Sequence, residues 1–413
     1  MADLTEHPDH DERLRRYAEL VVRVGAAVVP GTLVHVRGEV EHAELARAIA
    51  ESAYAAGARR VLVDYDDPHV RLSALRHAPL DALREAAGWE LQKMRELHDA
   101  RAALIRLSGS SDPHLFDGIA AERLAALPLE LAALSRQVTL GGRVTWVVAA
   151  APNRGWATQV FGEPDTERLW QAVSVALRLD EPDVVAAWHD HRQRLERRAA
   201  AMTALDLDSV RYHGPGTDLT VGLIPGSRWT GGGMTSEDGR TFMPNLPTEE
   251  VFTTPDRTRA DGVISLTRPL VMPRAGAVVE GLVVRFEGGR AVDVEATEGA
   301  DVVRAELATD EGSARLGEVS LVDGGSRVRA AGVVFHDTLY DENAGCHVAW
   351  GMGFPFSVDG AATPDELLAR GVNQSVVHTD VVVGGAGVSV DGITSNGDVV
   401  PVIADDVWVL PVS

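Results

Sequence analysis

The chain has 413 residues and a formal net charge of -22 at pH 7, and a surface of this sign repels nucleic-acid phosphates, so we expect no nucleic-acid partner. No apolar run reaches the length of a membrane span and the charged N-terminus has no signal-peptide core, so we expect a cytoplasmic protein without membrane contact. The only cysteine is Cys346, which excludes an internal disulfide and a multi-thiolate zinc site. The only lysine is Lys93, which leaves Schiff-base chemistry with essentially no candidate residue.

The first half of the chain predicts alternating strands and helices. The segment "HAELARAIAESAYAAG" has helical spacing and a glycine stop, and the short apolar run that follows it is typical of a strand. The expected elements, in chain order, are strand 31–40, helix 42–57, strand 58–67, a helix leading into a strand over 79–109, strand 143–152, and helices 165–179 and 181–205.

The pattern changes after Leu205. Alternating β-branched runs separated by glycine turns predict strands within 279–296, 326–335 and 375–392. We therefore expect an α/β N-terminal domain over 1–205 and a β-rich (α+β) C-terminal domain over 206–413.

Acidic and histidine side chains stand out in four blocks of the second half. In "SVVHTDVV", His378 and Asp380 are two residues apart, so both side chains leave the same face of a strand. In "RLGEVSLV", Glu318 is the one charged residue between apolar neighbours, and His347 follows the polar turn "DENAGC". With Glu249 or Glu250 from "NLPTEEVF", these residues are the mixture of ligands that Zn²⁺, Co²⁺ or Mn²⁺ accept.

Charge balance assigns a role to each member of the adjacent pair of glutamates. Two divalent cations are neutralised by three carboxylates and one bridging hydroxide. If Glu250, Glu318 and Asp380 are ligands, Glu249 is the surplus carboxylate that takes a proton from the metal-bound water. The opposite assignment of Glu249 and Glu250 stays open.

The blocks "NLPTEEVFTTPD", "LGEVSLV", "TLYDENAGCHVAWG" and "HTDVVVGG" resemble the aminopeptidase T/aminopeptidase S family of dinuclear metallopeptidases. The resemblance implies a homodimeric exopeptidase that removes N-terminal residues from short peptides through a metal-bridged hydroxide. It implies an N-terminal domain for dimerisation and for the wall of an enclosed cavity, and a C-terminal catalytic domain with two metal ions, zinc first and cobalt or manganese as alternatives. The ligands carried over by motif are Glu250, Glu318, His347, His378 and Asp380, with Glu249 as the base.

One position departs from the family pattern. Where relatives carry a tyrosine in a block ending "GxxYP", this chain has Phe354, and a phenyl ring cannot donate a hydrogen bond to an oxyanion. Tyr340 stands where we expect phenylalanine in relatives. The alternative function is therefore a member of the family with altered or weak peptidase activity, meaning other metal-dependent amide hydrolysis or peptide binding.

Two further features have simple interpretations. His189 and His191 in "HDH" are two residues apart on an arginine-rich helix, so we expect both on a solvated surface. Cys346, beside His347, is interpreted as a small buried residue rather than a soft metal ligand.

Overall fold

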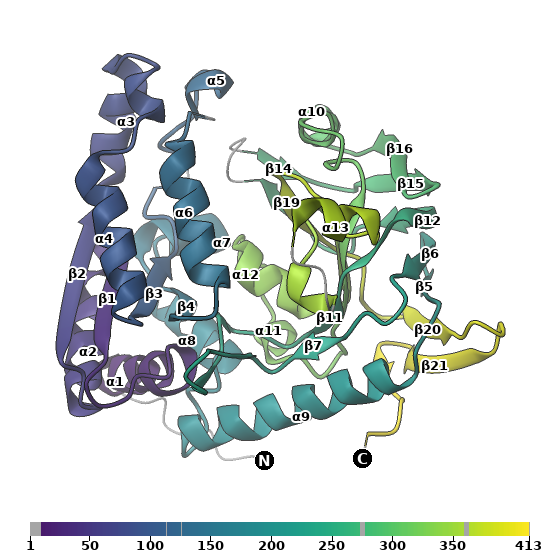
Figure 1. Cartoon of the computed structure of the whole chain (residues 1–413), viewed down its shortest axis with the longest axis horizontal. Helices are drawn as coiled ribbons and strands as arrows, with labels where there is room; N and C mark the ends of the chain where they lie inside the picture. Colours follow the sequence, from purple (N-terminus) through teal and green to yellow (C-terminus); the bar gives the residue numbers. More distant parts are fainter. Residues whose placement is uncertain (1–9, 113, 125, 273–276, 359–362, 413) are drawn as a thin grey trace. The chain divides into compact units, whose positions relative to one another are not determined.

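The computed structural model describes residues 10–112, 114–124, 126–272, 277–358 and 363–412. Contacts divide these residues into two compact units (Figure 1). The first comprises the chain up to Asp190 together with Gly233–Pro247, and the second comprises His191–Gly232, Thr248–Met272 and the chain from Ala277 onward. Among the described residues, no helix is both long and apolar enough to cross a membrane.

The first unit is built on a parallel sheet with the strand order β10-β4-β3-β1-β2. Parallel neighbours need crossover connections, and helices supply most of them. The strands are β1 (Leu33–Glu39), β2 (Arg60–Asp66), β3 (Ala103–Ser108), β4 (Thr145–Ala150) and β10 (Asn245–Leu246), with a small antiparallel pair of β8 (Met234–Thr235) and β9 (Thr241–Phe242). The helices are α1 (His10–Leu20), α2 (Ala43–Ala55), α3 (Pro68–His77), α4 (Gly88–Asp99), α5 (Ala121–Leu124), α6 (Leu129–Leu140), α7 (Arg154–Phe161) and α8 (Thr166–Ala176), with short turns η1 (Val21–Gly25), η2 (Val40–His42) and η3 (Ala82–Arg84).

Local signals explain where these elements begin and end. Helix α2 ends at Ala55, two residues before Gly57, whose φ of +91° a side-chain-bearing residue rarely adopts. Helix α7 begins after Asn153, whose side chain accepts a hydrogen bond of 2.9 Å from the Trp156 backbone N–H. The alternating strands and helices expected for the first half are confirmed.

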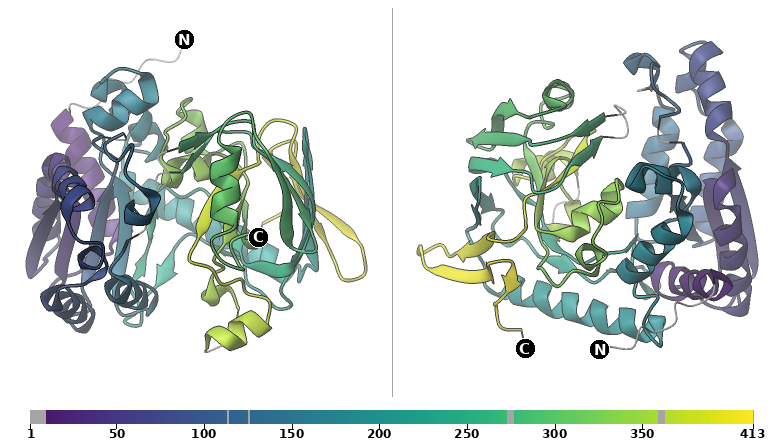
Figure 2. Two further views of the ribbon diagram at one scale, coloured as in Figure 1. Left: turned by 90° about the horizontal axis from the view of Figure 1, so that it is seen from above. Right: turned by 180° about the vertical axis from the view of Figure 1, so that it is seen from behind.

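The second unit contains two large antiparallel sheets (Figure 2) and the small antiparallel pair β13-β14. The large sheets have the orders β16-β15-β12-β6-β5-β20-β21-β22 and β19-β18-β17-β11-β7. The strands are β5 (Ser209–Gly214), β6 (Thr217–Leu223), β7 (Thr230–Gly231), β11 (Val251–Thr253), β12 (Pro255–Ser265), β13 (Leu270–Met272), β14 (Ala277–Val279), β15 (Val283–Glu287), β16 (Arg290–Glu295), β17 (Leu316–Leu321), β18 (His347–Gly351), β19 (His378–Val382), β20 (Ser389–Ile393), β21 (Val399–Ala404) and β22 (Val407–Trp408). The helices are α9 (Val184–Ala204), which enters this unit at His191, α10 (Ala300–Leu307), α11 (Arg327–Ala330), α12 (Thr338–Asp341) and α13 (Pro364–Ala369), with short turns η4 (Glu342–Ala344) and η5 (Pro355–Ser357).

Both sheets of the second unit contribute to one hydrophobic core, and β17 lies in it along its whole length. All six residues of β17 are buried, including Glu318 and Ser320. A buried strand normally consists of apolar residues, because an unpaired polar group in the core is costly. The two polar residues of β17 therefore need partners. Glu318 faces His347 of β18 and His378 of β19, and Ser320 donates to Glu250, just before β11.

Two sequence-based expectations are wrong. The segment 326–335 does not form a strand: it contains the short helix α11, because the Ser326 hydroxyl accepts a hydrogen bond from the Arg329 backbone N–H and caps a helical turn. His191 is not solvated: it is 4% exposed, and its Nε2 lies 2.8 Å from the carbonyl oxygen of Thr248. His189 is exposed, as expected.

Candidate metal centre

The side chains predicted as ligands come from neighbouring strands of the five-stranded sheet. Strand β17 carries Glu318, β18 begins with His347, and β19 carries His378 and Asp380. Glu250 directly precedes β11. Because the order β19-β18-β17-β11 makes these strands hydrogen-bonded neighbours, residues far apart in the sequence meet at one place in the sheet.

The five side chains form two groups that share Glu318. In the first group, His347 Nε2 lies 3.0 Å from Glu250 Oε2 and 4.0 Å from Glu318 Oε1. In the second, His378 Nε2 lies 3.3 Å from Glu318 Oε2 and 3.6 Å from Asp380 Oδ1. In each group the potential ligand atoms lie within 4.8 Å of one another. One oxygen of Glu318 faces each group, so this carboxylate can serve two cations at once.

Backbone carbonyl groups orient both imidazoles. His378 Nδ1 lies 2.8 Å from the Met352 carbonyl oxygen, and His347 Nδ1 lies 3.2 Å from the Gly345 carbonyl oxygen. A ring nitrogen in this position carries the proton and donates a hydrogen bond to the carbonyl, which leaves the free electron pair of the neutral ring on Nε2. Both Nε2 atoms face the carboxylates, as they do in metal sites where the second nitrogen is fixed by hydrogen bonding.

Burial of so many ionisable groups shifts their pKa values. Burial, with the charges of Glu250 and Asp380, raises the pKa of Glu318 to about 7. Burial lowers the pKa of His347, but the hydrogen bond and charge of Glu250 outweigh it and raise this pKa to about 10. The pKa of His378 rises to about 9, because the charge of Asp380 and the hydrogen bond to Glu318 outweigh burial. In the metal-free protein, protons therefore neutralise this cluster.

A divalent cation fits this cluster. The ligand atoms are carboxylate oxygens and imidazole nitrogens, which suit zinc and neighbouring metals. Glu250 is 7% exposed, Glu318 4% and His347 1%, so solvent poorly screens the repulsion between the two carboxylates. A bound cation supplies the positive charge that otherwise has to come from protons.

Sequence reasoning missed one acid beside the cluster. Glu342 begins the turn η4, and burial together with the charges of Asp380, Glu250 and Glu318 raises its pKa well above the usual range. A hydrogen bond between the Glu342 and Asp380 side chains contributes to this shift. The available signal was the position of two consecutive acids five and six residues before His347, in a block interpreted only as a polar turn.

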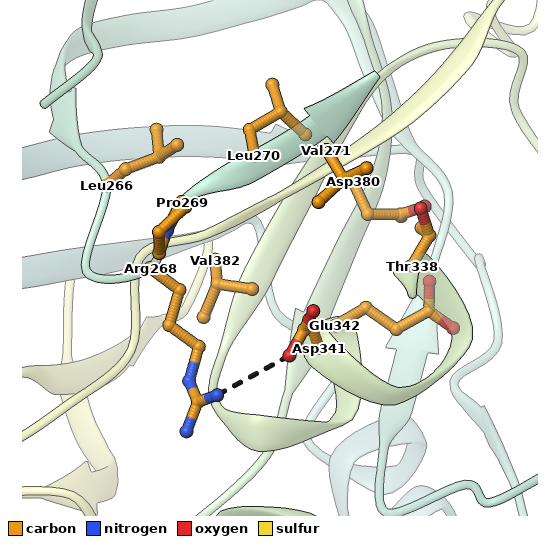
Figure 3. A pocket seen from close by; sticks show the side chains of 10 residues that line it. All are labelled: Leu266, Arg268, Pro269, Leu270, Val271, Thr338, Asp341, Glu342, Asp380 and Val382. Atoms are coloured by element: carbon orange, nitrogen blue, oxygen red, sulfur yellow. Dashed lines mark ion pairs between the residues drawn. The ribbon is translucent and has the colours of Figure 1, made fainter. Parts of the chain in front are cut away.

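Glu342 and Asp380 also line a pocket at the edge of the cluster (Figure 3). Its wall includes an ion pair in which Arg268 lies 3.5 Å from Asp341. The other lining residues are Leu266, Pro269, Leu270, Val271, Thr338 and Val382. The pocket thus joins an apolar wall to two carboxylates of the site.

The adjacent glutamates make different contacts. Glu250 Oε2 accepts a hydrogen bond of 2.7 Å from Ser320 Oγ and faces His347. Glu249 Oε2 lies 3.4 Å from His191 Nε2 and 3.8 Å from an Arg194 nitrogen, both on α9. The structure therefore brings Glu250 into the cluster and places the Glu249 carboxylate against a helix.

The two aromatic positions noted in the sequence occupy different surroundings. The Phe354 ring lies 5.2 Å from the ring of His378 and 5.3 Å from the ring of Phe252, so it packs beside a potential ligand. Tyr340 is fully buried, with its ring 4.5 Å from that of Phe335. Cys346 is 1% exposed, and burial raises the pKa of its thiol to about 12, in agreement with the interpretation as a core residue.

Comparison with known proteins places this arrangement in a family. The family model described as thermophilic metalloprotease (M29) matches residues 10–408. The chain belongs to the M29 family. Aminopeptidase T of Thermus aquaticus is 39% identical to this M29 chain over 411 residues, which covers 97% of the chain and 99% of that protein. Aminopeptidase PepS of Streptococcus thermophilus is 37% identical, with coverage of 98% and 99%.

A solved M29 structure has the same fold. Wild-type AmpT from Thermus thermophilus matches with a TM-score of 0.89 and 35% identity, covering 97% of this chain and 100% of that one. The family expected from the four sequence blocks is confirmed. As an M29 metalloprotease, the protein is a hydrolase that acts on peptide bonds and uses a divalent metal.

The raised pKa values predict how pH affects the metal-free M29 protein. The pKa of Glu318 is raised from the ordinary glutamate value of 4.5 to about 7, so the stabilising effect of its bound proton is lost as pH rises across this interval. Protonated His347 and His378 stabilise the fold fully below 6.5, and this effect is lost as pH rises through their pKa values of about 10 and about 9. We expect the midpoint temperature for unfolding of the chelated protein to fall as the pH rises from about 5 to about 9.

The metal-loaded protein is the matched control for this pH series. Metal binding displaces protons from its ligands, so the affinity rises with pH and the loaded fold gains stability relative to the metal-free one. Thermal unfolding with chelator and with excess zinc at several pH values measures the difference between the two midpoints. A difference that shrinks as pH rises would contradict the prediction.

Proposed function

We propose that this M29 protein is a metal-dependent aminopeptidase that removes N-terminal residues from short peptides. The observation that carries the proposal is the pair of ligand groups that share the buried Glu318. Relatives named as aminopeptidases, 35% to 39% identical and matched over nearly their whole length, support the same activity. They do not favour the alternative that Phe354 marks a weak or redirected enzyme.

Two divalent ions are part of the proposal, with zinc first and cobalt or manganese as alternatives. Glu250, Glu318 and His347 would hold one ion, and Glu318, His378 and Asp380 would hold the other. When bound, the ions would polarise the scissile carbonyl group and lower the pKa of a water molecule. The β-rich part of the chain, predicted as 206–413, is accordingly proposed as the catalytic domain.

The chain's own residues orient this site and hold its protons. The carbonyl groups that accept from the Nδ1 atoms of His347 and His378 keep both Nε2 atoms toward the carboxylates. Glu342, beside Asp380, has a raised pKa and can hold a proton at its carboxyl oxygen. The assignment of Glu249 as proton acceptor stays a prediction, and its test accompanies the further inference below.

Two further parts of the proposal rest on the sequence. A homodimer, with the domain over 1–205 serving in dimerisation and in the cavity wall, rests on the family resemblance. A cytoplasmic location rests on the single cysteine, which fits a reducing compartment.

Hydrolysis of matched peptides tests the proposed activity. The zinc-loaded protein is incubated with a panel of short peptides and with the same peptides carrying an N-terminal acetyl group, and mass spectrometry identifies the products. We expect stepwise loss of N-terminal residues from the free peptides only, with no cleavage after chelation, and metal analysis should give about two equivalents per chain. Cleavage of acetylated peptides at internal bonds, or no cleavage of any peptide, would sink the proposal.

The substitution Phe354→Tyr tests whether the absent phenol matters. Loss of one oxyanion donor typically costs about 10²- to 10³-fold in kcat, but the relatives favour ordinary activity in this chain. We therefore expect Phe354→Tyr to change kcat on a short peptide by less than about tenfold. Tyr340→Phe is the control and should leave kcat unchanged. A rise of about 10²-fold in Phe354→Tyr, or loss of activity in Tyr340→Phe, would show that a phenol takes part.

A further inference from the structure

The segment that delivers Glu250 to the metal centre is not held by a sheet. Strand β11 begins at Val251, so the backbone of 248–250 lies outside the ladder that fixes the direction of the other predicted ligands. Glu249 and Glu250 are nevertheless buried, at 4% and 7% exposure. Side-chain hydrogen bonds therefore have to supply the order that strand pairing supplies elsewhere.

Helix α9 provides two of these contacts. Arg194 has only donors, so its nitrogen, 2.7 Å from His191 Nδ1, donates to that ring atom. His191 Nδ1 is therefore the acceptor and Nε2 carries the proton. Nε2 lies 2.8 Å from the Thr248 carbonyl oxygen, to which it donates, and 3.4 Å from Glu249 Oε2. The two helix residues thus fix both a backbone carbonyl and a carboxylate.

Residues that precede β18 hold Glu249, the middle residue of the segment. The Glu249 backbone N–H donates a 2.7 Å hydrogen bond to Asn343 Oδ1, and Asn343 is fully buried. The Arg327 backbone N–H donates to Glu249 Oε1 at 3.2 Å. Both carboxylate oxygens of Glu249 therefore have partners, and the backbone on the N-terminal side of its Cα is tied down.

We propose that His191 and Arg194 are positioning residues that act through Glu249 to orient Glu250 toward His347. The inference rests on the metal site of the proposed function, but it concerns metal affinity rather than the reaction. Outer partners of metal ligands typically change affinity or activity by about 10- to 100-fold when they are removed. Here His191 and Arg194 contact Glu249, the residue before the predicted ligand Glu250, instead of contacting the ligand itself.

Zinc affinity, measured by competition with a chromogenic chelator, tests the proposal on the full chain. We expect His191→Ala and Arg194→Ala each to bind zinc about 10- to 100-fold more weakly, with turnover recovered at saturating zinc. Glu249→Gln should weaken zinc binding to the same extent. His191→Gln is the conservative variant: its amide has an NH₂ donor group and an acceptor oxygen, so it can replace both roles of the neutral imidazole, and its affinity should lie closer to the parent. His189→Gln and Arg197→Ala, exposed positions on the same helix, are matched controls and should bind like the parent.

Three results would overturn the positioning role. The first is parental affinity in both His191→Ala and Arg194→Ala. The second is equal weakening in His191→Gln and His191→Ala, which would indicate a general packing defect. The third is Glu249→Gln with parental affinity but about 10²- to 10⁴-fold lower turnover, which would make Glu249 the proton acceptor. A protein that binds zinc but cleaves no peptide would contradict the proposed function. The comparison of zinc affinity between the variants and the parent would still hold.

Discussion

Replacing Glu318 with glutamine is expected to remove bound metal from both ligand groups and to lower turnover by more than about 10²-fold. This loss is larger than the one that follows removal of a residue that only hydrogen-bonds to a metal ligand. Glu318 offers one oxygen to the group with His347 and the other to the group with His378. Glutamine keeps the shape but is neutral and presents an amide NH₂, a donor, toward one of the two ligand groups. Metal analysis after dialysis, followed by peptide hydrolysis, measures both effects.

Comparing the metal-free parent with metal-free Glu318→Gln shows whether the variant has lost a ligand or has misfolded. Glu318 has a raised pKa because burial and the charges of Glu250 and Asp380 disfavour its ionised form, so the charge costs stability near neutral pH. Chelated Glu318→Gln should therefore unfold at or above the temperature of the chelated parent. Glu295→Gln, an exposed acid on β16, is the control and should keep metal and activity. Two metal equivalents in Glu318→Gln would contradict the bridging role.

Replacing Trp350 with alanine is expected to cost about 3 to 5 kcal/mol of unfolding free energy, the usual range for removal of a buried aromatic ring. Trp350 is fully buried on β18, three residues after His347, so the two side chains leave opposite faces of the strand. Its Nε1 donates to Glu306 Oε1 at 2.9 Å, and Thr379 Oγ1 donates to the same oxygen at 2.7 Å. Glu306 of α10 thus ties β18 to the helix through Trp350 and ties β19 to it through Thr379.

Two variants define the size of this effect in urea unfolding of the zinc-loaded protein. Trp350→Phe keeps most of the ring and loses the donor to Glu306, so it should cost less, about 1 to 3 kcal/mol. Trp89→Ala removes a side chain that is 69% exposed and should change stability by no more than about 0.5 kcal/mol. If Trp350→Ala loses no more unfolding free energy than Trp350→Phe, neighbouring side chains fill the space left by the ring, and the prediction is wrong.

The positions that sequence reasoning found share one property: each conflicts with its surroundings. Glu318 is charged within an apolar strand, and His378 and Asp380 share a face of another strand. Such conflicts are visible in one dimension, because the period of a strand says which side chains meet. The order of the strands is not visible in this way, and only that order brings Glu318 close to both His347 and His378.

The missed and wrong predictions have identifiable physical causes. Glu342 lies in a turn among other polar residues, where an acid is ordinary until the strand carrying Asp380 is placed beside it. His191 sits among charged residues of α9, and only its contact with Thr248 makes it a buried residue. At Ser326 a local cap signal competed with the β-branched run that follows, and the cap prevailed. Long-range contacts decided the first two cases and local hydrogen bonding the third.

The route of the chain through the two units has a consequence for fragments of the protein. The segment Gly233–Pro247 returns to the first unit and adds β10 beside β4, where Asn245 pairs with Val148. A fragment that ends at residue 205 lacks this strand, so the polar backbone groups along that side of β4 lose their partners. Unpaired strand edges pair with other chains, so such a fragment is expected to self-associate during expression. A fragment that extends to residue 247 keeps β10 paired with β4. On the ribosome, the parallel sheet is likewise completed only after part of the second unit has already emerged.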